Sequence, residues 1–263
     1  MQVCLVLALL GLMSATMARA DVVCTLIVEV ATGSVLREDG DCETRVTPAS
    51  TFKIPLAVMG FAAGVLQDAE TPVMHWQPGD PDWGGAAWVQ PTGPASWMQH
   101  SVVWYSQRIT RALGAGALTA YARGFGYGTA DFSGDAGFDN GLERAWIASS
   151  LLVSPREQAG FLRALLLENL PVAADAMAQA RGLVERQDVG AWEIRGKTGT
   201  AYPRRADRSF DRARGWGWYV GWAERDGRVL VFVRLTQGGA PAGLSGGVAT
   251  RDAFLREWPD LAR

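Results

Sequence analysis

Lysine is scarce in this 263-residue chain: of the 25 Lys and Arg residues, only Lys53 and Lys197 are Lys. Codon bias can replace Lys with Arg wherever a side chain contributes only charge and solubility. A guanidinium cannot lose its proton in a protein, whereas a buried amine can, and a neutral amine can act as a base or a nucleophile. The two lysines are therefore candidates for chemistry that arginine cannot perform.

Histidine and cysteine are also few. The chain has two His and three Cys residues, and only Cys24 and Cys42 follow residue 20. Two thiols and the two imidazoles of His75 and His100 do not readily form a four-ligand zinc site. We therefore expect neither a metal nor a resident cofactor.

The chain lacks both a strong charge of one sign and a long apolar run. Its net charge of −2 provides no electrostatic footprint for nucleic acid, so no nucleic-acid partner is expected. No stretch reaches the roughly 20 apolar residues that cross a membrane, so stable membrane insertion is not expected. No apolar stripe marks an interface, which leaves the oligomeric state open.

The first twenty residues, "MQVCLVLALLGLMSATMARA", have the layout of a signal peptide. An apolar stretch from Val3 to Met13 is followed by small residues, and the ending Ala18-Arg19-Ala20 fits cleavage before Asp21. We expect residues 1–20 to direct export to the periplasm or the medium and residues 21–263 to form one catalytic domain. The usual basic residues at the start are missing, so a buried first strand is the alternative.

Two predicted strands joined by a turn contain the two remaining cysteines. In "CTLIVEVATGSVLREDGDC" a turn at Ala31 to Ser34 and a register pairing Val30 with Leu36 set Cys24 opposite Cys42. An oxidising compartment would favour a disulfide between them. Two buried free thiols are the other interpretation of the same pattern.

The patterning predicts an α+β fold, in which an antiparallel sheet made from both chain ends is flanked by helices and a helical region is inserted between them. Strand-like alternation occurs at Val22 to Val30, Trp192 to Thr200, Trp216 to Trp222 and Val229 to Leu235. Helices are predicted at Ser50 to Leu66, Trp97 to Leu113, Leu118 to Gly124, Ser154 to Asn169 and Gly247 to Glu257.

Both lysines lie in motifs that could carry chemistry. Ser50 and Lys53 are three residues apart at the start of a predicted helix, so the amine can reach the hydroxyl and activate it. Lys197 begins "KTGT" in a predicted strand, where Thr198 adds a hydroxyl and Gly199 permits close approach of a ligand. Each motif alone also fits a helix cap or a surface strand with a solvated Lys.

Further segments complete a family resemblance. The chain resembles the class D β-lactamases, or oxacillinases, among the penicillin-recognising serine enzymes, and the resemblance covers nearly all of residues 21–263. It rests on Ser50-Thr51-Phe52-Lys53, Ser101-Val102-Val103, Tyr127-Gly128, Lys197-Thr198-Gly199 and the segment from Gly141 to Gln158.

The resemblance implies a set of catalytic roles. Ser50 would attack the lactam carbonyl, and Lys53, carbamylated by carbon dioxide to N6-carboxylysine, would be the general base. Ser101 would relay a proton to the leaving nitrogen. Trp146 would donate its indole N–H to the carbamate, and Val103 would line the pocket around it. Carbon dioxide or bicarbonate is then required for activity.

It also implies how the substrate is held. The backbone N–H groups of Ser50 and Thr200 would form the oxyanion hole, while Lys197, Thr198 and Arg251 would bind the substrate carboxylate. The substrate would be a β-lactam of the penicillin type.

One position departs from the family pattern: Thr129 follows Tyr127-Gly128 where the family usually has Asn. All the proposed proton-transfer groups remain, so we expect an altered substrate preference rather than loss of activity.

Two other functions share these motifs. A penicillin-binding sensor domain stays acylated and transmits a signal, and a peptidoglycan transpeptidase or carboxypeptidase also uses S-x-x-K and K-T-G. The absence of membrane spans argues against the sensor. The lactamase is favoured over the transpeptidase by Ser101-Val102-Val103 and by the segment around Trp146.

Overall fold

A computed structural model describes residues 20–263 of the protein, and it is built on one six-stranded sheet in the order β2-β1-β6-β5-β4-β3. Every neighbouring pair of strands is antiparallel. The strands are β1 (Asp21–Glu29), β2 (Val35–Gly40), β3 (Arg186–Val189), β4 (Trp192–Ala201), β5 (Trp216–Arg225) and β6 (Arg228–Gln237). The predicted signal peptide lies, apart from Ala20, outside the described residues.

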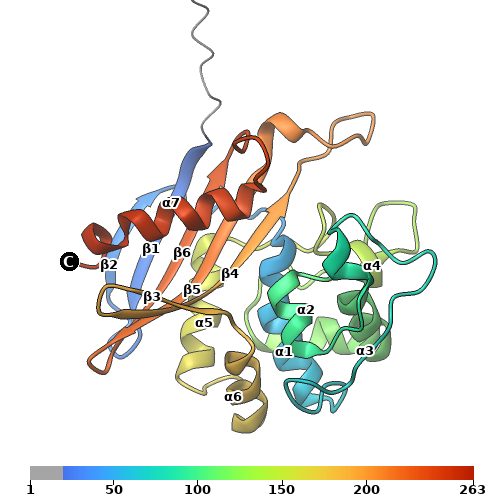
Figure 1. Ribbon diagram of the computed structural model, residues 1–263, viewed down its shortest axis with the longest axis horizontal. Helices are drawn as coiled ribbons and strands as arrows, with labels where there is room; N and C mark the ends of the chain where they lie inside the picture. Colours follow the sequence, from blue (N-terminus) through green and yellow to red (C-terminus); the bar gives the residue numbers. More distant parts are fainter. Residues whose placement is uncertain (1–19) are drawn as a thin grey trace, which may run out of the picture.

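The sheet joins the two ends of the chain, as the sequence predicts. β1 pairs with β6 from Asp21 opposite Gln237 to Glu29 opposite Leu230, so the first and last strands are neighbours (Figure 1). The predicted α+β architecture is confirmed. The short strand β3 is an addition that the patterning missed.

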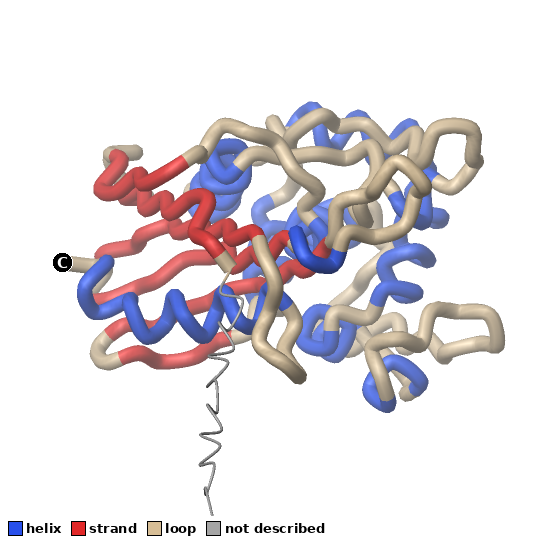
Figure 2. Tube along the Cα trace, turned by 90° about the horizontal axis from the view of Figure 1, so that it is seen from above, coloured by secondary structure: helices blue, strands red, loops and turns tan. Residues whose placement is uncertain are grey.

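Helices cover both faces of the sheet and form a helical region beside it (Figure 1). They are η1 (Ala49–Phe52), α1 (Lys53–Ala62), η2 (Ala86–Val89), α2 (Pro94–His100), α3 (Val103–Gly124), α4 (Gly141–Arg144), α5 (Pro155–Leu166), α6 (Ala174–Gly182), η3 (Arg212–Arg214) and α7 (Gly246–Leu261). In Figure 2 most helices and long loops gather at the right, beside the strands at the left. Among the described residues, no helix is both long enough and apolar enough to cross a membrane.

The sheet has a hydrophobic core on each face, because side chains alternate between the two faces along each strand. Ile27 and Phe232 pack with Phe254 and Trp258 of α7 on one face of the sheet. Leu26 lies in the larger core on the other face, because successive side chains of a strand point to opposite sides. The sheet is thus held between α7 and the helical region.

Several predicted helix boundaries are wrong. The helix predicted over residues 97–113 is broken at Ser101, whose backbone is left-handed with φ 58° and ψ 33°. Its second part runs on to Gly124 through a non-helical Gly114, so the helix predicted over residues 118–124 is the end of α3. The first predicted helix ends at Ala62 instead of Leu66.

The start of α5 agrees with the sequence. Ser154 accepts a hydrogen bond from the Glu157 N–H, while the Glu157 side chain accepts one from the Ser154 N–H. Pro155 occupies the first helical position, where its missing N–H costs nothing. This reciprocal cap fixes the direction in which α5 leaves the preceding loop.

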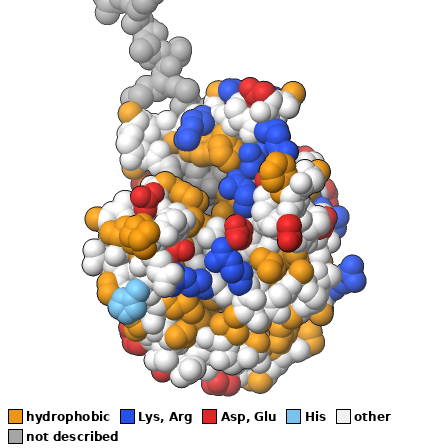
Figure 3. Space-filling view, turned by 90° about the vertical axis from the view of Figure 1, so that its right-hand side faces the viewer, with side chains coloured by type: hydrophobic (Ala, Val, Ile, Leu, Met, Phe, Trp, Pro, Cys, Tyr) orange, Lys and Arg blue, Asp and Glu red, His pale blue; other side chains and the backbone are white. Residues whose placement is uncertain are grey.

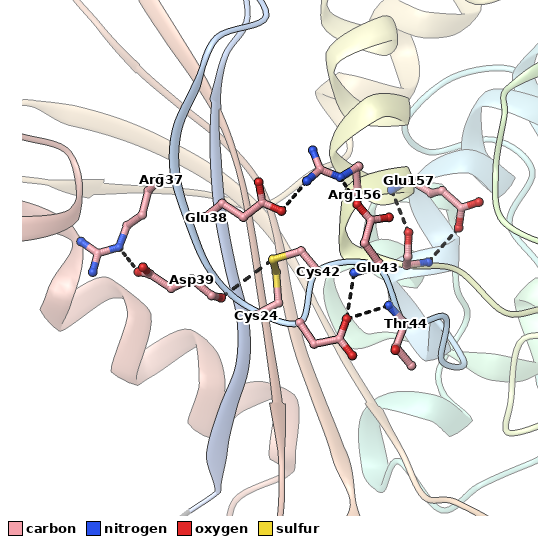
Figure 4. Close-up of a disulfide and its surroundings, with 11 residues drawn as sticks. Cys24, Arg37, Glu38, Asp39, Cys42, Glu43, Thr44, Arg156 and Glu157 are labelled. Carbon is pink, nitrogen blue, oxygen red and sulfur yellow. Dashed lines mark hydrogen bonds and ion pairs between the residues drawn. A yellow bond between two sulfur atoms is a disulfide. The ribbon is translucent and has the colours of Figure 1, made fainter.

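The hairpin register was predicted incorrectly, although Cys24 and Cys42 are joined by a disulfide with 5.1 Å between their Cα atoms. Cys24 pairs with Gly40, and an irregularity between Ile27 and Val28 shifts the ladder. Cys42 therefore lies just beyond the end of β2, at the end of the hairpin away from its turn, and bonds to Cys24 of β1 (Figure 4). No free thiol remains at either position.

Arg156 of α5 links the segment around the disulfide to the helical region. Its guanidinium pairs with Glu38 and Glu43, which flank the disulfide along the chain (Figure 4). All three side chains are partly exposed, so the pairs orient the hairpin more than they stabilise it.

Candidate active site

Ser50 lies on a tight turn that leads directly into α1. It belongs to the 3₁₀ helix η1 and is half-buried, and α1 begins three residues later at Lys53. Ala49, just before it, has φ 51°, a conformation that a non-glycine residue adopts only where the surroundings impose it. The Ala49 N–H donates to the Trp146 carbonyl at 3.0 Å, which helps to hold this strained turn in place.

The side chain of Lys53 is buried. It is 1% exposed, and within residues 20–263 its Nζ has no hydrogen-bond partner. The Trp97 ring centroid lies 5.9 Å from Nζ. Burial, and then the nearby charge of Lys197, holds the pKa of Lys53 well below its ordinary value of 10.5. The amine is therefore biased toward its neutral form, which a guanidinium could not adopt.

Lys197 on β4 and Ser101 at the end of α2 are in direct contact. The Lys197 Nζ on β4 donates to the Ser101 Oγ at 2.5 Å, although the residues are far apart in the sequence. Ser101 caps the end of α2 rather than the start of α3, and its left-handed backbone aims the hydroxyl at β4. Burial lowers the pKa of Lys197 to about 8; Glu185 opposes this shift and Arg251 adds to it.

A first pocket of about 240 Å³ joins the polar residues predicted to bind the substrate carboxylate. Its lining includes Ser101, Lys197, Thr198 and Arg251. The guanidinium of Arg251 on α7 is 2.9 Å from the carboxylate of Asp252, a neighbour that the sequence reasoning did not consider. An incoming carboxylate would find several donors here, and it would compete with Asp252 and with Glu185, which also lines the pocket.

A second pocket of about 220 Å³ lies at the other end of the same stretch of β4. Thr200, predicted to contribute to the oxyanion hole, lines it together with Tyr202. The Thr200 Oγ1 accepts a hydrogen bond from the Gly247 N–H at 2.8 Å, which ties this end of β4 to α7. The predicted substrate-binding residues thus divide between two pockets.

Gly199 stands between these pockets and packs against the turn that carries Ser50. A Cβ at Gly199 would lie 2.9 Å from the Pro48 carbonyl oxygen and 3.1 Å from the Thr51 Cγ2. Glycine is needed here because it lets β4 approach the turn of Pro48 and Thr51 closely. The close approach of a ligand to Gly199 stays a prediction. The contact sets the distance between β4 and Ser50.

Trp146 and Val103 are both buried. The Trp146 ring centroid is 5.5 Å from that of Phe52, and its carbonyl accepts the hydroxyl of Thr47 at 2.9 Å. Val103 is the first residue of α3, directly after the Ser101 turn. Their predicted contacts with a modified Lys53 stay predictions.

A buried hydrogen-bond chain that the sequence did not reveal anchors the nucleophile turn. The Tyr127 hydroxyl pairs with the Gln158 Oε1 at 3.2 Å, and the Gln158 Nε2 donates to the Thr51 Oγ1 at 2.7 Å. Thr51 in turn donates to the Pro48 carbonyl at 2.7 Å. Thr51 and Tyr127 belong to motifs in the sequence, but only the fold shows that Gln158 joins them.

Thr129 makes hydrogen bonds of its own to the segment beyond α4. Its hydroxyl donates to the Ser150 carbonyl at 3.0 Å and accepts from the Leu152 N–H at 3.1 Å. The hydroxyl thus ties the Tyr127-Gly128 loop to the chain near Trp146. The Tyr127-Gly128 loop is therefore held by hydrogen bonds even though Thr129 lacks the side-chain amide of the family's usual Asn.

Known proteins are similar to this chain in sequence and in fold. The Transpeptidase family, described as the penicillin binding protein transpeptidase domain, matches residues 23–257. β-Lactamase OXA-9 of Klebsiella pneumoniae is 40% identical over 240 residues, covering 90% of this chain and 87% of its own. β-Lactamase OXA-1 of Escherichia coli is 34% identical over 232 residues, covering 87% and 80%. The crystal structure of OXA-427 class D β-lactamase matches with a TM-score of 0.83 at 41% identity, covering 91% of this chain and 98% of that one.

Proposed function

Since the chain belongs to the class D β-lactamases, serine hydrolases that open cyclic amides, we propose that it hydrolyses β-lactam antibiotics through an acyl-enzyme on Ser50 and so gives resistance to them. The observation that carries the mechanism is the Lys53 amine, buried and without a hydrogen-bond partner among the described residues. A buried polar group of this kind costs free energy unless a partner or a modification satisfies it.

The Lys53 amine fits a carbamate. Its depressed pKa favours the neutral form that can add carbon dioxide, and its burial protects the product from water. Carbon dioxide bound there supplies a carboxylate base at the end of the lysine side chain. The indole of Trp146 is proposed to donate to that carboxylate, and Val103 is proposed to exclude water from it.

In the proposed acylation, the Ser50 Oγ gives its proton to the base on Lys53 and forms a bond to the lactam carbonyl carbon. The amide C–N bond then breaks, and the leaving nitrogen takes that proton from the base through Ser101, which leaves the base free again. Lys197 holds the Ser101 hydroxyl in place at 2.5 Å. Water, deprotonated by the same base, hydrolyses the ester and frees Ser50 for another cycle.

Two further groups of contacts are proposed for the substrate. The N–H groups of Ser50 and Thr200 stabilise the oxyanion, a contribution of roughly 3 to 4 kcal/mol per donor in serine hydrolases. Lys197, Thr198 and Arg251 bind the substrate carboxylate, which is consistent with their shared place in the first pocket.

We also propose export through the signal peptide at residues 1–20. The disulfide between Cys24 and Cys42 supports this proposal, since such bonds persist in oxidising compartments and are rare in the cytosol.

A transpeptidase or sensor that is acylated without turnover is the second candidate. It is favoured by one observation, the match of residues 23–257 to the penicillin binding protein transpeptidase domain. The two candidates differ only after acylation, because both need Ser50 to attack the lactam.

A time course of chromogenic β-lactam hydrolysis, with and without added bicarbonate, separates the candidates. We expect sustained turnover that rises with bicarbonate; a single stoichiometric burst in both conditions would favour the second candidate. Lys53→Arg keeps the positive charge but should abolish turnover. Lys197→Arg is the comparison, and any turnover it retains should still respond to bicarbonate. Wild-type turnover in Lys53→Arg would remove the carbamate from the mechanism.

A further inference from the structure

Half of β4 has an open edge that connects the two pockets. β3 pairs with β4 only up to Arg195, and β5 pairs with the whole of β4 on the other side. Among the described residues, no strand covers the second edge from Lys197 to Ala201. An extended ligand can lie along such an edge and bond to its backbone.

The order of residues along this edge places the nucleophile between the pockets. Lys197 and Thr198 line the first pocket, Gly199 packs against the turn bearing Ser50, and Thr200 and Tyr202 line the second. Each pocket is smaller than the roughly 300 to 1,000 Å³ of a cleft that holds a whole drug-sized ligand, so each can hold one part of the substrate. If the carboxylate enters the first pocket, as the proposed function requires, the acyl side chain points toward the second.

The loop that borders the second pocket is rich in arginine. Residues 202–215, "YPRRADRSFDRARG", contain five Arg and two Asp. Four of these arginines have a carboxylate within 4 Å: Arg204 and Arg208 approach Asp135, while Arg205 and Arg214 approach Asp211. Arg212 alone of the five has no ion-pair partner among the residues that the structure describes.

Arg212 lies over the ring of Tyr202, with its guanidinium carbon 5.1 Å from the ring centroid, and both residues line the second pocket. The rest of the lining is neutral and includes Trp216, Ala240 and Leu244. No carboxylate lines this pocket in the described part of the chain. The second pocket therefore offers a ligand a largely apolar surface and one unpaired cation, Arg212, which is held in position by the Tyr202 ring.

We infer that the second pocket selects β-lactams whose acyl side chain carries a negative charge beside an apolar group, and that Arg212 is the specificity-determining residue. A guanidinium on a ring can pair with a carboxylate or sulfonate in a bidentate manner. Figure 3 shows Lys and Arg side chains, with Asp and Glu side chains among them, on the face at the right of Figure 1.

A matched pair of substrates isolates this effect. Benzylpenicillin and α-carboxybenzylpenicillin differ only by the carboxylate on the acyl side chain. The measurement is kcat/KM for both substrates, at fixed bicarbonate, in the wild type, Arg212→Gln, Arg212→Lys and Arg205→Gln. Arg205→Gln removes the same charge from the same loop, but Arg205 is paired with Asp211 and lines neither pocket.

We expect Arg212→Gln to lower the ratio of kcat/KM for the carboxylated over the neutral substrate by about three- to tenfold. Arg212→Lys should restore part of that ratio, and Arg205→Gln should leave it near the wild-type value. An unchanged ratio in Arg212→Gln, or an equal change in Arg205→Gln, would overturn the inference while leaving the proposed function intact. Failure of the wild type to open either substrate would overturn both.

Discussion

Gly199→Ala tests whether the distance between β4 and the nucleophile turn controls activity. The added methyl would lie 2.9 Å from the Pro48 carbonyl oxygen, 3.1 Å from the Thr51 Cγ2 and 3.3 Å from the Thr51 N. The first neighbour is backbone, so it cannot rotate away, and the turn must move by several tenths of an ångström. Gly199 has no positive φ, so alanine meets no backbone strain and the effect is purely steric.

The expected cost has two parts. Overfilling a packed contact costs about 1 to 3 kcal/mol of unfolding free energy. Moving a reacting atom by as much as 1 Å costs roughly a hundredfold in rate, so a smaller shift of Ser50 should lower kcat/KM by about ten- to a hundredfold. Urea denaturation measures the first part and chromogenic β-lactam hydrolysis measures the second.

Gly160→Ala is the matched control. Gly160 lies within α5, and a Cβ there would have no neighbour within 4 Å. Alanine at an open helical position should stabilise the fold by roughly 0.5 to 1 kcal/mol and leave kcat/KM unchanged. Wild-type activity and stability in Gly199→Ala would refute the reasoning, because the contact would then tolerate the extra methyl.

The other predictions concern charge and cross-linking. Because the pKa of Lys197 is lowered to about 8, kcat/KM for a carboxylate-bearing substrate should fall as pH rises through that value, and a pH profile that stays flat well above it would contradict this role. The unfolded chain keeps that proton up to about 10.5, so Lys197 should also make the unfolding free energy rise with pH between the two values, measurable by urea titration. Arg251→Ala should lower kcat/KM about tenfold or more, mainly through KM, and an unchanged value would remove Arg251 from the site. Replacing Cys24 and Cys42 with Ser should lower the unfolding free energy by about 3 kcal/mol, since the bond spans 18 residues of sequence, while kcat/KM stays near wild type in steady-state assays.

The sheet was largely predictable because its central strands show their burial in the sequence. β5 and β6 are apolar runs joined by a short turn, and their antiparallel pairing follows from that spacing. β3, "RQDV", is polar and partly exposed, so it has no such pattern. The hairpin register failed for a different reason: the turn closes earlier than predicted, with the Glu29 N–H donating to the Ser34 carbonyl. The irregularity between Ile27 and Val28 shifts the ladder once more, which strict alternation cannot foresee.

The site was predictable where residue identity itself carries chemistry. Two lysines among many arginines identified Lys53 and Lys197, and both prove to be buried. The left-handed turn at Ser101, which breaks the predicted helix and directs the hydroxyl to Lys197, depends on contacts distant in sequence. The same holds for Gln158, whose amide joins Thr51 to Tyr127 from another helix.

The pairing of β1 with β6 also constrains how the chain can reach this state. Asp21 finds its partner only at Gln237, so the sheet cannot be completed until nearly the whole polypeptide has been synthesised. Contacts between residues so distant in sequence form slowly, because the entropy of closing the intervening loop must be lost first. β1 can pair early with β2, its neighbour along the chain, but its other edge should stay unpaired until β6 has been synthesised.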